Sequence, residues 1–307
     1  MNKIDMHFHS TCSDGKNTHE EILEQAKQKG LEFIALTDHD NISGDFQKKA
    51  EDFWIKSTQS LEISARNYEH EKSLHLTCYA KSFADDIYEI LDGIKDARKN
   101  NLEKQVDVLQ SNWFNISLWD LENISQSMQR SIEALNKFDL AKIIYEDPQN
   151  RNRWIELNNW VDIWLVEFYL QYFKRNWEKF ETFWVLVPEY EPSLEVCKII
   201  QETNNAILSI AHPNFTFQED IWGFIDYIEY YIQTAWINAL EINSKASVEW
   251  INVVKKTAEK YGLFITFWSD NHGIWNTDNK HSDFWELNPN LTLEFIEKEF
   301  EKYRNIL

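Results

Sequence analysis

The hydrophobic and polar positions of the chain follow two patterns. Seven short apolar runs predict strands, and they read "KIDMHFHS" (3–10), "LEFIALTDHD" (31–40), "SLEISA" (60–65), "SLHLTCYA" (73–80), "AILSIAHP" (206–213), "ALEINS" (239–244) and "LFITFWSD" (263–270). Stretches with helical spacing of apolar residues lie between several of these runs, for example over 18–30 and 247–262. Strands that alternate with helices predict an α/β fold built from parallel βα units.

The helix at 18–30 carries clear boundary signals. Thr18 stands at the N-cap position, and Glu21 three residues later completes the pattern of a capping box. Gly30 follows the last turn, where helices often end in a left-handed residue. We therefore predict a helix that connects the first two strands.

Residues 84–190 show a different pattern. Two long stretches, at 85–113 and 158–184, have helical periodicity and few strand signals. We predict a helical insertion domain over 84–190 that caps the active site. The domain that this insertion interrupts is then formed by residues 1–83 and 191–307.

Composition narrows the class of protein. The 307 residues are 43% hydrophobic and 27% charged, which is an ordinary globular balance. The net charge of −20 disfavours binding of extended duplex nucleic acid, because phosphate backbones need clustered Lys and Arg. A small anionic substrate stays compatible with this charge if bound cations reverse the local field.

Cysteine content and hydropathy predict a cytoplasmic location. Cys12, Cys78 and Cys197 form an odd, scattered set without a CxxC spacing, which fits a reducing compartment. The N-terminus lacks the apolar stretch of a secretory signal, and no apolar run approaches the ~20 residues of a membrane span.

Histidines are concentrated where the predicted strands lie or end. Six of the nine histidines lie within a predicted strand or just after its end: His7, His9, His39, His75, His212 and His272. Several carboxylates lie close to them in the sequence: Asp5, Asp14, Asp38, Asp40 and Asp270. Neutral imidazole and carboxylate are good ligands for zinc, manganese and iron. Since the C-terminal ends of parallel strands meet at one edge, this joint pattern predicts a metal site.

The separate motifs carry less information than the set. His7 and His9 stand at i and i+2, so on a strand they point to the same face and both can bind one ion, although a lone HxH is usually incidental. "TDHD" by itself is compatible with a capped turn. The three remaining histidines lie in polar surroundings, and we expect them at the surface: His19, His70 and His281.

Taken in order, "DMHFHSTCSDG", "ALTDHD", "LEISA", "HLTCYA", "AHP" and "SDNHG" resemble the polymerase and histidinol phosphatase (PHP) family of metal-dependent phosphoesterases. The resemblance covers roughly 1–80 and 195–290. It implies a distorted seven-stranded (β/α)7 barrel with three divalent metal ions (Mn, Zn or Fe). The insertion after "HLTCYA" looks most like the branch that acts on nucleoside 3′,5′-bisphosphates and RNA 5′ ends.

The resemblance also implies a ligand set, carried over residue by residue. His7, His9, Glu62 and Asp270 would hold one metal, Glu62, His75 and His212 a second, and Asp14, His39 and His272 a third. Asp5 and Asp38 neighbour these ligands and would orient an imidazole through its other nitrogen.

The implied reaction is hydrolysis of a phosphomonoester, or trimming of short RNA, by a hydroxide shared between metal ions. Asp14, His39 and His272 are the candidate catalytic residues for protonating the leaving oxygen. Arg98 or Lys99 is a candidate phosphate contact, with a solvated helix face as the alternative. Two other functions stay open: a histidinol-phosphate phosphatase, and a non-catalytic metal-loaded regulatory module.

Tryptophan stands at several positions where glycine is expected. Trp268 precedes the "SD" of the last motif, and Trp54, Trp275 and Trp285 occupy turn-like positions. The chain has 7 Gly and 14 Trp, whereas about 7% glycine is usual. One hypothesis is that the source reads UGA as glycine, and the alternative is a protein that is simply rich in tryptophan.

Overall fold

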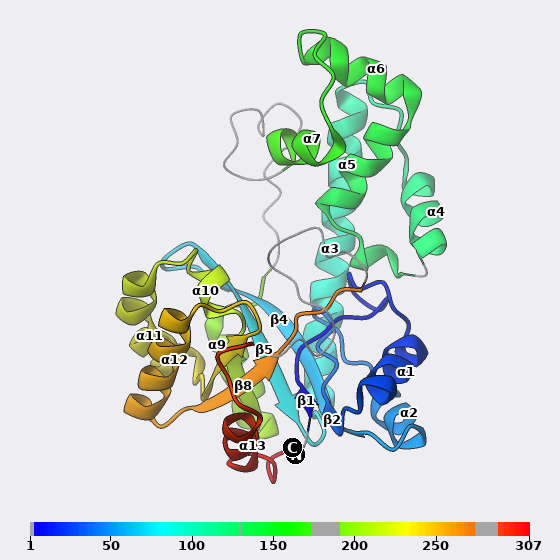
Figure 1. The fold of residues 1–307 in the computed structure, drawn as a ribbon. Helices are drawn as coiled ribbons and strands as arrows, with labels where there is room; N and C mark the ends of the chain where they lie inside the picture. Colours follow the sequence, from blue (N-terminus) through cyan, green and yellow to red (C-terminus); the bar gives the residue numbers. More distant parts are fainter. Residues whose placement is uncertain (1–2, 129, 174–190, 274–287) are drawn as a thin grey trace. The chain divides into compact units, whose positions relative to one another are not determined.

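The fold is described by a computed structural model over residues 3–128, 130–173, 191–273 and 288–307. Two of the tryptophans singled out above, Trp275 and Trp285, and also His281, lie outside the described residues. The chain divides into two compact units, of which unit 1 comprises 1–91 and 191–307 and unit 2 comprises 92–190 (Figure 1).

Unit 1 contains a small parallel sheet formed by the first part of the chain. Its strands lie in the order β1 (Ile4–Asp5), β2 (Phe33–Ile34) and β3 (Lys56–Ser57). The side chains of β1 and β2 are buried. The histidines of the first two motifs lie beyond the C-terminal ends of these strands, His7 and His9 after β1 and His39 after β2.

A larger sheet of five strands forms the rest of the β-structure of unit 1. In order these are β4 (Gln59–Asn67), β5 (Lys72–Ala80), β6 (Ile207–Ile210), β7 (Ala239–Asn243) and β8 (Phe264–Trp268). The β6–β7–β8 part is parallel, whereas β5 runs antiparallel to both of its neighbours. The all-parallel arrangement expected from the sequence is therefore wrong for β5, which runs against both β4 and β6. Only four residues connect β4 and β5, and a parallel crossover needs a dozen or more.

The strand ladders form two sheets and, within the described residues, no closed barrel. Two isolated parallel bridges nevertheless join segments of the two sheets. Phe8 pairs with Asn271 beyond β1 and β8, and His39 pairs with Glu62 between the segment after β2 and strand β4. Both bridges involve residues of the histidine-rich motifs, so the two sheets meet where those motifs lie.

Helices flank the sheets of unit 1. They are α1 (His19–Lys29), α2 (Phe46–Asp52), α9 (Leu194–Asn204), α10 (Pro213–Thr216), α11 (Ile221–Ala235), α12 (Val248–Tyr261) and α13 (Leu293–Glu301). Figure 1 shows α1 and α2 beside β1 and β2, and α11 and α12 on the other side of the unit. The predicted N-terminal helix is confirmed, with its capping box at Thr18 and Glu21 and with Gly30 at a φ of 70°.

Unit 2 is helical throughout its described part. Its elements are α3 (Asp85–Ser111), whose first turns belong to unit 1, α4 (Leu118–Met128), the 3-10 turn η1 (Ile132–Ala134), α5 (Lys137–Glu146), α6 (Pro148–Leu157) and α7 (Leu165–Tyr172). Its core combines aliphatic and aromatic side chains, and within it the fully buried Trp154 stacks on Phe168 with ring centroids 4.9 Å apart. Whether this unit caps the active site stays a prediction.

The described helices include none that is both long and apolar enough to cross a membrane. The three cysteines are free, and Cys78 and Cys197 are fully buried. Burial raises the pKa of both buried thiols, which makes them poor nucleophiles.

Candidate metal centre

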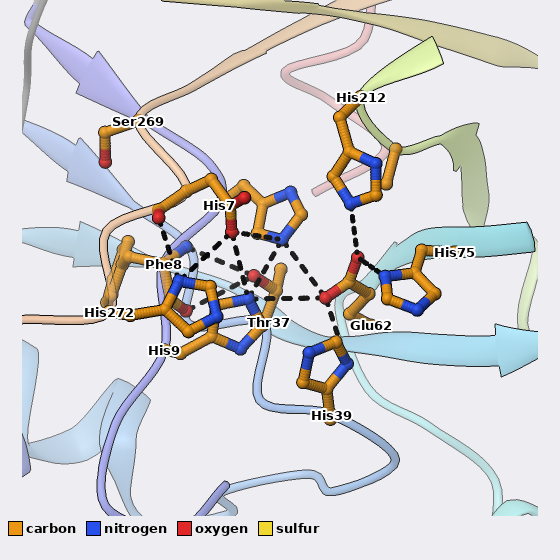
Figure 2. Close-up of polar contacts among 12 residues, drawn as sticks. His7, Phe8, His9, Thr37, His39, Glu62, His75, His212, Ser269 and His272 are labelled. Carbon is orange, nitrogen blue, oxygen red and sulfur yellow. Dashed lines mark hydrogen bonds and ion pairs between the residues drawn. The ribbon is translucent and has the colours of Figure 1, made fainter. Parts of the chain in front are cut away.

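Nine side chains with metal-binding chemistry gather at one edge of the strands of unit 1, as Figure 2 shows for most of them. They are His7, His9 and Asp14 after β1, His39 after β2, Glu62 in β4, His75 in β5, His212 after β6, and Asp270 and His272 after β8. The structure thus brings together all the predicted ligand residues. The sequence separates some of them by more than 260 residues.

Glu62 lies at the centre of the group and is 1% exposed. Its Oε1 lies 3.1 Å from His75 Nδ1 and 3.2 Å from His212 Nε2. Its Oε2 lies 3.3 Å from Nε2 of both His7 and His9. The two oxygens of this carboxylate therefore face two different groups of imidazoles (Figure 2).

The group formed by His7 and His9 is the most deeply buried. Nε2 of His7 and Nε2 of His9 lie 3.1 Å apart, and neither side chain is exposed to solvent. Oδ1 of Asp270 approaches them to 3.7 Å and 3.4 Å, respectively. With Oε2 of Glu62, nitrogen and oxygen atoms from three distant segments thus surround one small volume.

A third group lies on the more exposed side of the site. Nε2 of His272 lies 3.3 Å from Oδ1 of Asp14, and Nε2 of His39 lies 3.8 Å from Oδ2 of the same carboxylate. The side chain of Asp14 is 28% exposed, whereas that of Glu62 is 1% exposed. The cluster is therefore closed at His7 and open to solvent at Asp14 and at His75, whose side chain is 38% exposed.

The charges in the cluster depend on one another. Burial by itself raises the pKa of Glu62, but the surrounding imidazoles, with His39 contributing most, hold that pKa well below its usual range. Burial lowers the pKa of His9, but its contacts with Asp270 and Glu62 outweigh this effect and raise the pKa to about 10. The carboxylates thus favour positive charge on His9, whereas burial outweighs them at His39 and lowers its pKa to about 3.

Glu241 is a buried acid of the site that the sequence analysis missed. It lies in β7, is inaccessible to solvent, and places Oε2 3.0 Å from Nδ1 of His7. Its Oε1 accepts a hydrogen bond from the backbone N–H of His212. One carboxylate therefore orients two of the motif segments. The available signal was an acidic residue inside the otherwise apolar run "ALEINS".

Asp5 and Asp38 hold backbone and serine groups of the site. Oδ1 of Asp5 accepts hydrogen bonds from the N–H groups of His7 and Ser269, and Oδ2 accepts one from the Ser269 hydroxyl at 2.7 Å. Asp38 Oδ1 accepts hydrogen bonds from Ser10 N–H and Ser13 Oγ, both at 2.7 Å. Their predicted role of orienting an imidazole stays a prediction.

Asp38→Asn is expected to lower the free energy of unfolding by about 2 kcal/mol. The NH₂ group of the asparagine would face the hydrogen-bond donors of Ser10 and Ser13, and these buried donors would lose an acceptor. Urea denaturation of the metal-free protein measures this change, with the exposed Asp52→Asn as the matched control. Equal stability of the two variants would show that Asp38 does not hold this loop.

Two of the candidate ligands have strained backbones. His212 and Asp270 adopt positive φ angles of 33° and 53°. Such conformations are uncommon for non-glycine residues and occur preferentially at functional sites. The geometry of the motif loops, rather than local preference, therefore sets the direction of these two side chains.

Trp268 does not have the backbone of a turn. It ends strand β8, is 5% exposed, and its ring centroid lies 4.8 Å from that of His7. Although glycine is expected at this position, Trp268 has no positive φ, and the positive φ of this segment falls on Asp270.

The histidines expected at the surface differ from one another. His70 is exposed, as predicted. His19 is only 8% exposed, so its predicted surface position is wrong. Its ring packs edge-on against Phe46 at 5.3 Å, and its Nε2 lies 3.5 Å from Cys12 Sγ.

A family model described as the PHP domain matches residues 5–160. Curated relatives align over shorter stretches. They include a phosphoribosyl 1,2-cyclic phosphate 1,2-diphosphodiesterase of Eggerthella lenta (38% identity, 24% of this chain and 28% of the relative). A 3',5'-nucleoside bisphosphate phosphatase of Chromobacterium violaceum is 46% identical over 14% of this chain and 15% of its own length. The chain thus spans less than a third of the length of these relatives.

Two solved structures share the fold over nearly the whole chain. One, from Bifidobacterium adolescentis, is described as a metal-dependent phosphoesterase and superposes with a TM-score of 0.69 at 18% identity, covering 98% of this chain and 96% of that one. The other, described as an amidohydrolase from Chromobacterium violaceum with bound sulfate, has a TM-score of 0.69 at 19% identity, covering 97% and 96%. At such identities the likeness concerns the fold.

Proposed function

Since this chain belongs to the PHP domain family, we propose that it is a metal-dependent hydrolase that removes phosphate from a small phosphorylated substrate. The observation that carries the proposal is the convergence of imidazole nitrogens and carboxylate oxygens around Glu62. Three sets of these atoms approach within 4.8 Å of one another: His9, Asp14, His39 and His272; His7, His9 and Glu62; His39, Glu62 and His75.

The donor set fits divalent cations of the zinc, manganese and iron type. Mixed nitrogen and oxygen ligands suit all three metals, and the buried carboxylates supply the negative charge that such ions require. The two oxygens of Glu62 face different imidazole groups, which supports its assignment as a bridging ligand. We propose three ions, held by the three ligand sets that the sequence analysis assigns.

Bound divalent ions would supply an activated water and neutralise the charge of a phosphate group. The residues of this chain define the rest of the reaction. His7, His9 and Glu62 form a closed inner side, so the substrate enters from the exposed side, where the side chains of Asp14 and His75 are 28% and 38% exposed. Asp14, His39 and His272 line this side and are the candidates for delivering a proton to the leaving oxygen.

We propose a nucleotide 3′-phosphate or a short RNA as the substrate class. Support comes from the matched relatives, one of which is named a 3',5'-nucleoside bisphosphate phosphatase. Another, a 5'-3' exoribonuclease of Haemophilus influenzae, is 38% identical over 20% of this chain and 23% of its own length. Arg98 lies on α3 in unit 2, and its contact with a substrate phosphate stays a prediction, as does the cytoplasmic location.

Phosphate release tests this function directly. The protein is loaded with manganese, zinc or iron and assayed with a nucleoside 3′,5′-bisphosphate, a 5′-phosphorylated RNA oligomer, a cyclic phosphodiester and histidinol phosphate. Turnover of the first two supports the proposal, and preference for histidinol phosphate favours the alternative phosphatase. Tight metal binding without any turnover would favour a non-catalytic regulatory module.

Glu241→Gln is expected to weaken metal binding by about 10–100-fold, the range found when an acid that orients a metal-binding histidine is removed. The carboxylate that accepts from Nδ1 of His7 keeps Nε2 of this ring directed at His9 and Glu62. Isothermal titration of the metal-free protein with zinc measures the affinity.

The exposed Glu249→Gln on α12 is the matched control for this measurement, because it removes an equal charge outside the site. Circular dichroism confirms that both variants are folded. Identical zinc affinities for the two variants would show that Glu241 does not position His7.

A further inference from the structure

Tryptophan occupies the left-handed position that terminates two helices. After α2, Trp54 has a φ of 64°, its N–H donates to Glu51 O at 3.0 Å, and the next N–H, of Ile55, donates to Ala50 O at 3.0 Å. After α3, Trp113 has a φ of 67° and donates to Gln110 O at 2.9 Å. This pair of hydrogen bonds defines the helix ending that glycine usually occupies.

The same chain uses glycine at the equivalent place in other helices. Gly30 after α1 has a φ of 70°, its N–H donates to Lys27 O at 3.0 Å, and the N–H of Leu31 donates to Ala26 O at 2.9 Å. Gly262 after α12 has a φ of 66°. The residue that follows is buried and apolar whether glycine or tryptophan precedes it: Leu31, Ile55, Phe114 and Leu263. The two residue types therefore hold one structural role.

Two more tryptophans share this backbone conformation. Trp160 beyond α6 has a φ of 63°, and Trp236 at the end of α11 has a φ of 54°. A Cβ atom makes this conformation costly. Glycine has none and adopts it freely, and asparagine adopts it more readily than other residues do. Trp54, Trp113 and Trp160 are 91%, 81% and 76% exposed, so burial of the indole does not offset that cost.

Other tryptophans have the surroundings expected of this residue. Trp154 is fully buried and stacks on Phe168. Trp250 is 2% exposed and packs edge-on against Phe224 at 5.5 Å. Glycine at either place would leave a large cavity in a close-packed core.

We propose that UGA encodes glycine in the gene of this protein, and that the native chain carries glycine at positions 54, 113, 160 and 236. Tryptophan has one standard codon, UGG, which differs from UGA only in its third base, so reading UGA as tryptophan inserts an indole wherever this glycine codon stands. Trp154 and Trp250 are genuine tryptophans in this assignment. The shortage of glycine, 7 residues beside 14 Trp, has the same origin.

The codons and the native protein test this assignment. The expected result is UGA at the four left-handed positions and UGG at 154 and 250. Peptide mass spectrometry of the protein from its source should then give glycine masses at the four positions. UGG at any of the four overturns the proposal for that position, and UGA at 154 or 250 overturns the assignment of those two.

Thermal unfolding of the recombinant chain tests the backbone argument independently. Trp54→Gly and Trp113→Gly are each expected to raise the thermal midpoint by roughly 2 °C or more. Trp119→Gly is the matched control, because Trp119 is 67% exposed but lies within α4, where glycine is unfavourable. A lower midpoint for Trp54→Gly and Trp113→Gly than for the unmodified chain would overturn the proposal.

Discussion

Glu62→Gln is expected to abolish metal-dependent phosphate release, with a fall in kcat/KM of at least about a thousand-fold, or ~4 kcal/mol. The carboxylate lies within 3.3 Å of five imidazoles and is the negative charge that they share: His7, His9, His39, His75 and His212. A neutral amide keeps the shape but removes the charge that favours cations at this point. Phosphate release and metal content per chain are the two measurements.

The control for this variant is Glu259→Gln, an exposed residue on α12 that carries the same charge far from any candidate ligand. Near-ultraviolet circular dichroism distinguishes loss of the site from loss of the fold. Activity of Glu62→Gln within ten-fold of the unmodified protein, with full metal content, would disprove the central role of this carboxylate.

The second large effect is a rise in stability that we expect when a divalent metal is added to the chelator-treated protein. A ligand present at a thousand times its dissociation constant stabilises the folded state by about 4 kcal/mol. Every candidate ligand lies in unit 1, so the thermal midpoint of unit 1 is expected to rise by roughly 10 °C. Hydrogen exchange read by mass spectrometry assigns the change to its unit, and peptides from β4 should gain protection whereas those from α5 and α6 should not.

A His19→Ala variant separates this response from a fourth group of possible ligands. Cys12, His19 and Asp38 also lie within ligand distance of one another. The oxygens of Asp38, however, already accept hydrogen bonds from Ser10, Ser13 and Ser43. The variant should therefore retain the full metal response. Loss of the response would move the metal site to this group.

The residues of the candidate site could be predicted because the local sequence shows their residue types and their positions after apolar runs. A histidine or aspartate that follows an apolar run keeps its place at a strand end whatever the arrangement of the strands. For this reason the motifs "DMHFHS", "TDHD" and "SDNH" indicated a common edge, and the structure brings their side chains to one. Glu241 escaped prediction because its only signal, an acid in a buried strand, acquires meaning through a partner 234 residues away.

The pairing partners and the direction of strand β5 were not predicted from the sequence. The sequence predicts strands at 60–65 and 73–80 but not that β5 pairs antiparallel with both β4 and β6. The pairing with β4 follows from the four-residue connection between the two strands, whereas the pairing with β6 joins segments that the insertion separates in the sequence. The amino-acid composition does not reveal the left-handed backbone of Trp54 and Trp113, although the deficit of glycine beside the excess of tryptophan drew attention to the tryptophan positions.

From the sequence alone we could identify the candidate metal-binding side chains and the N-terminal helix with its caps, because these depend on residue type, short spacing and the resemblance of the motifs to a known family. Only the tertiary structure decided which oxygen of Glu62 faces which imidazoles and which acid orients His7. It also separated left-handed, exposed tryptophans from buried ones. The orientation of Glu62 and the role of Glu241 arise from contacts between segments far apart in the chain, whereas the left-handed tryptophans follow from local hydrogen bonds at helix ends.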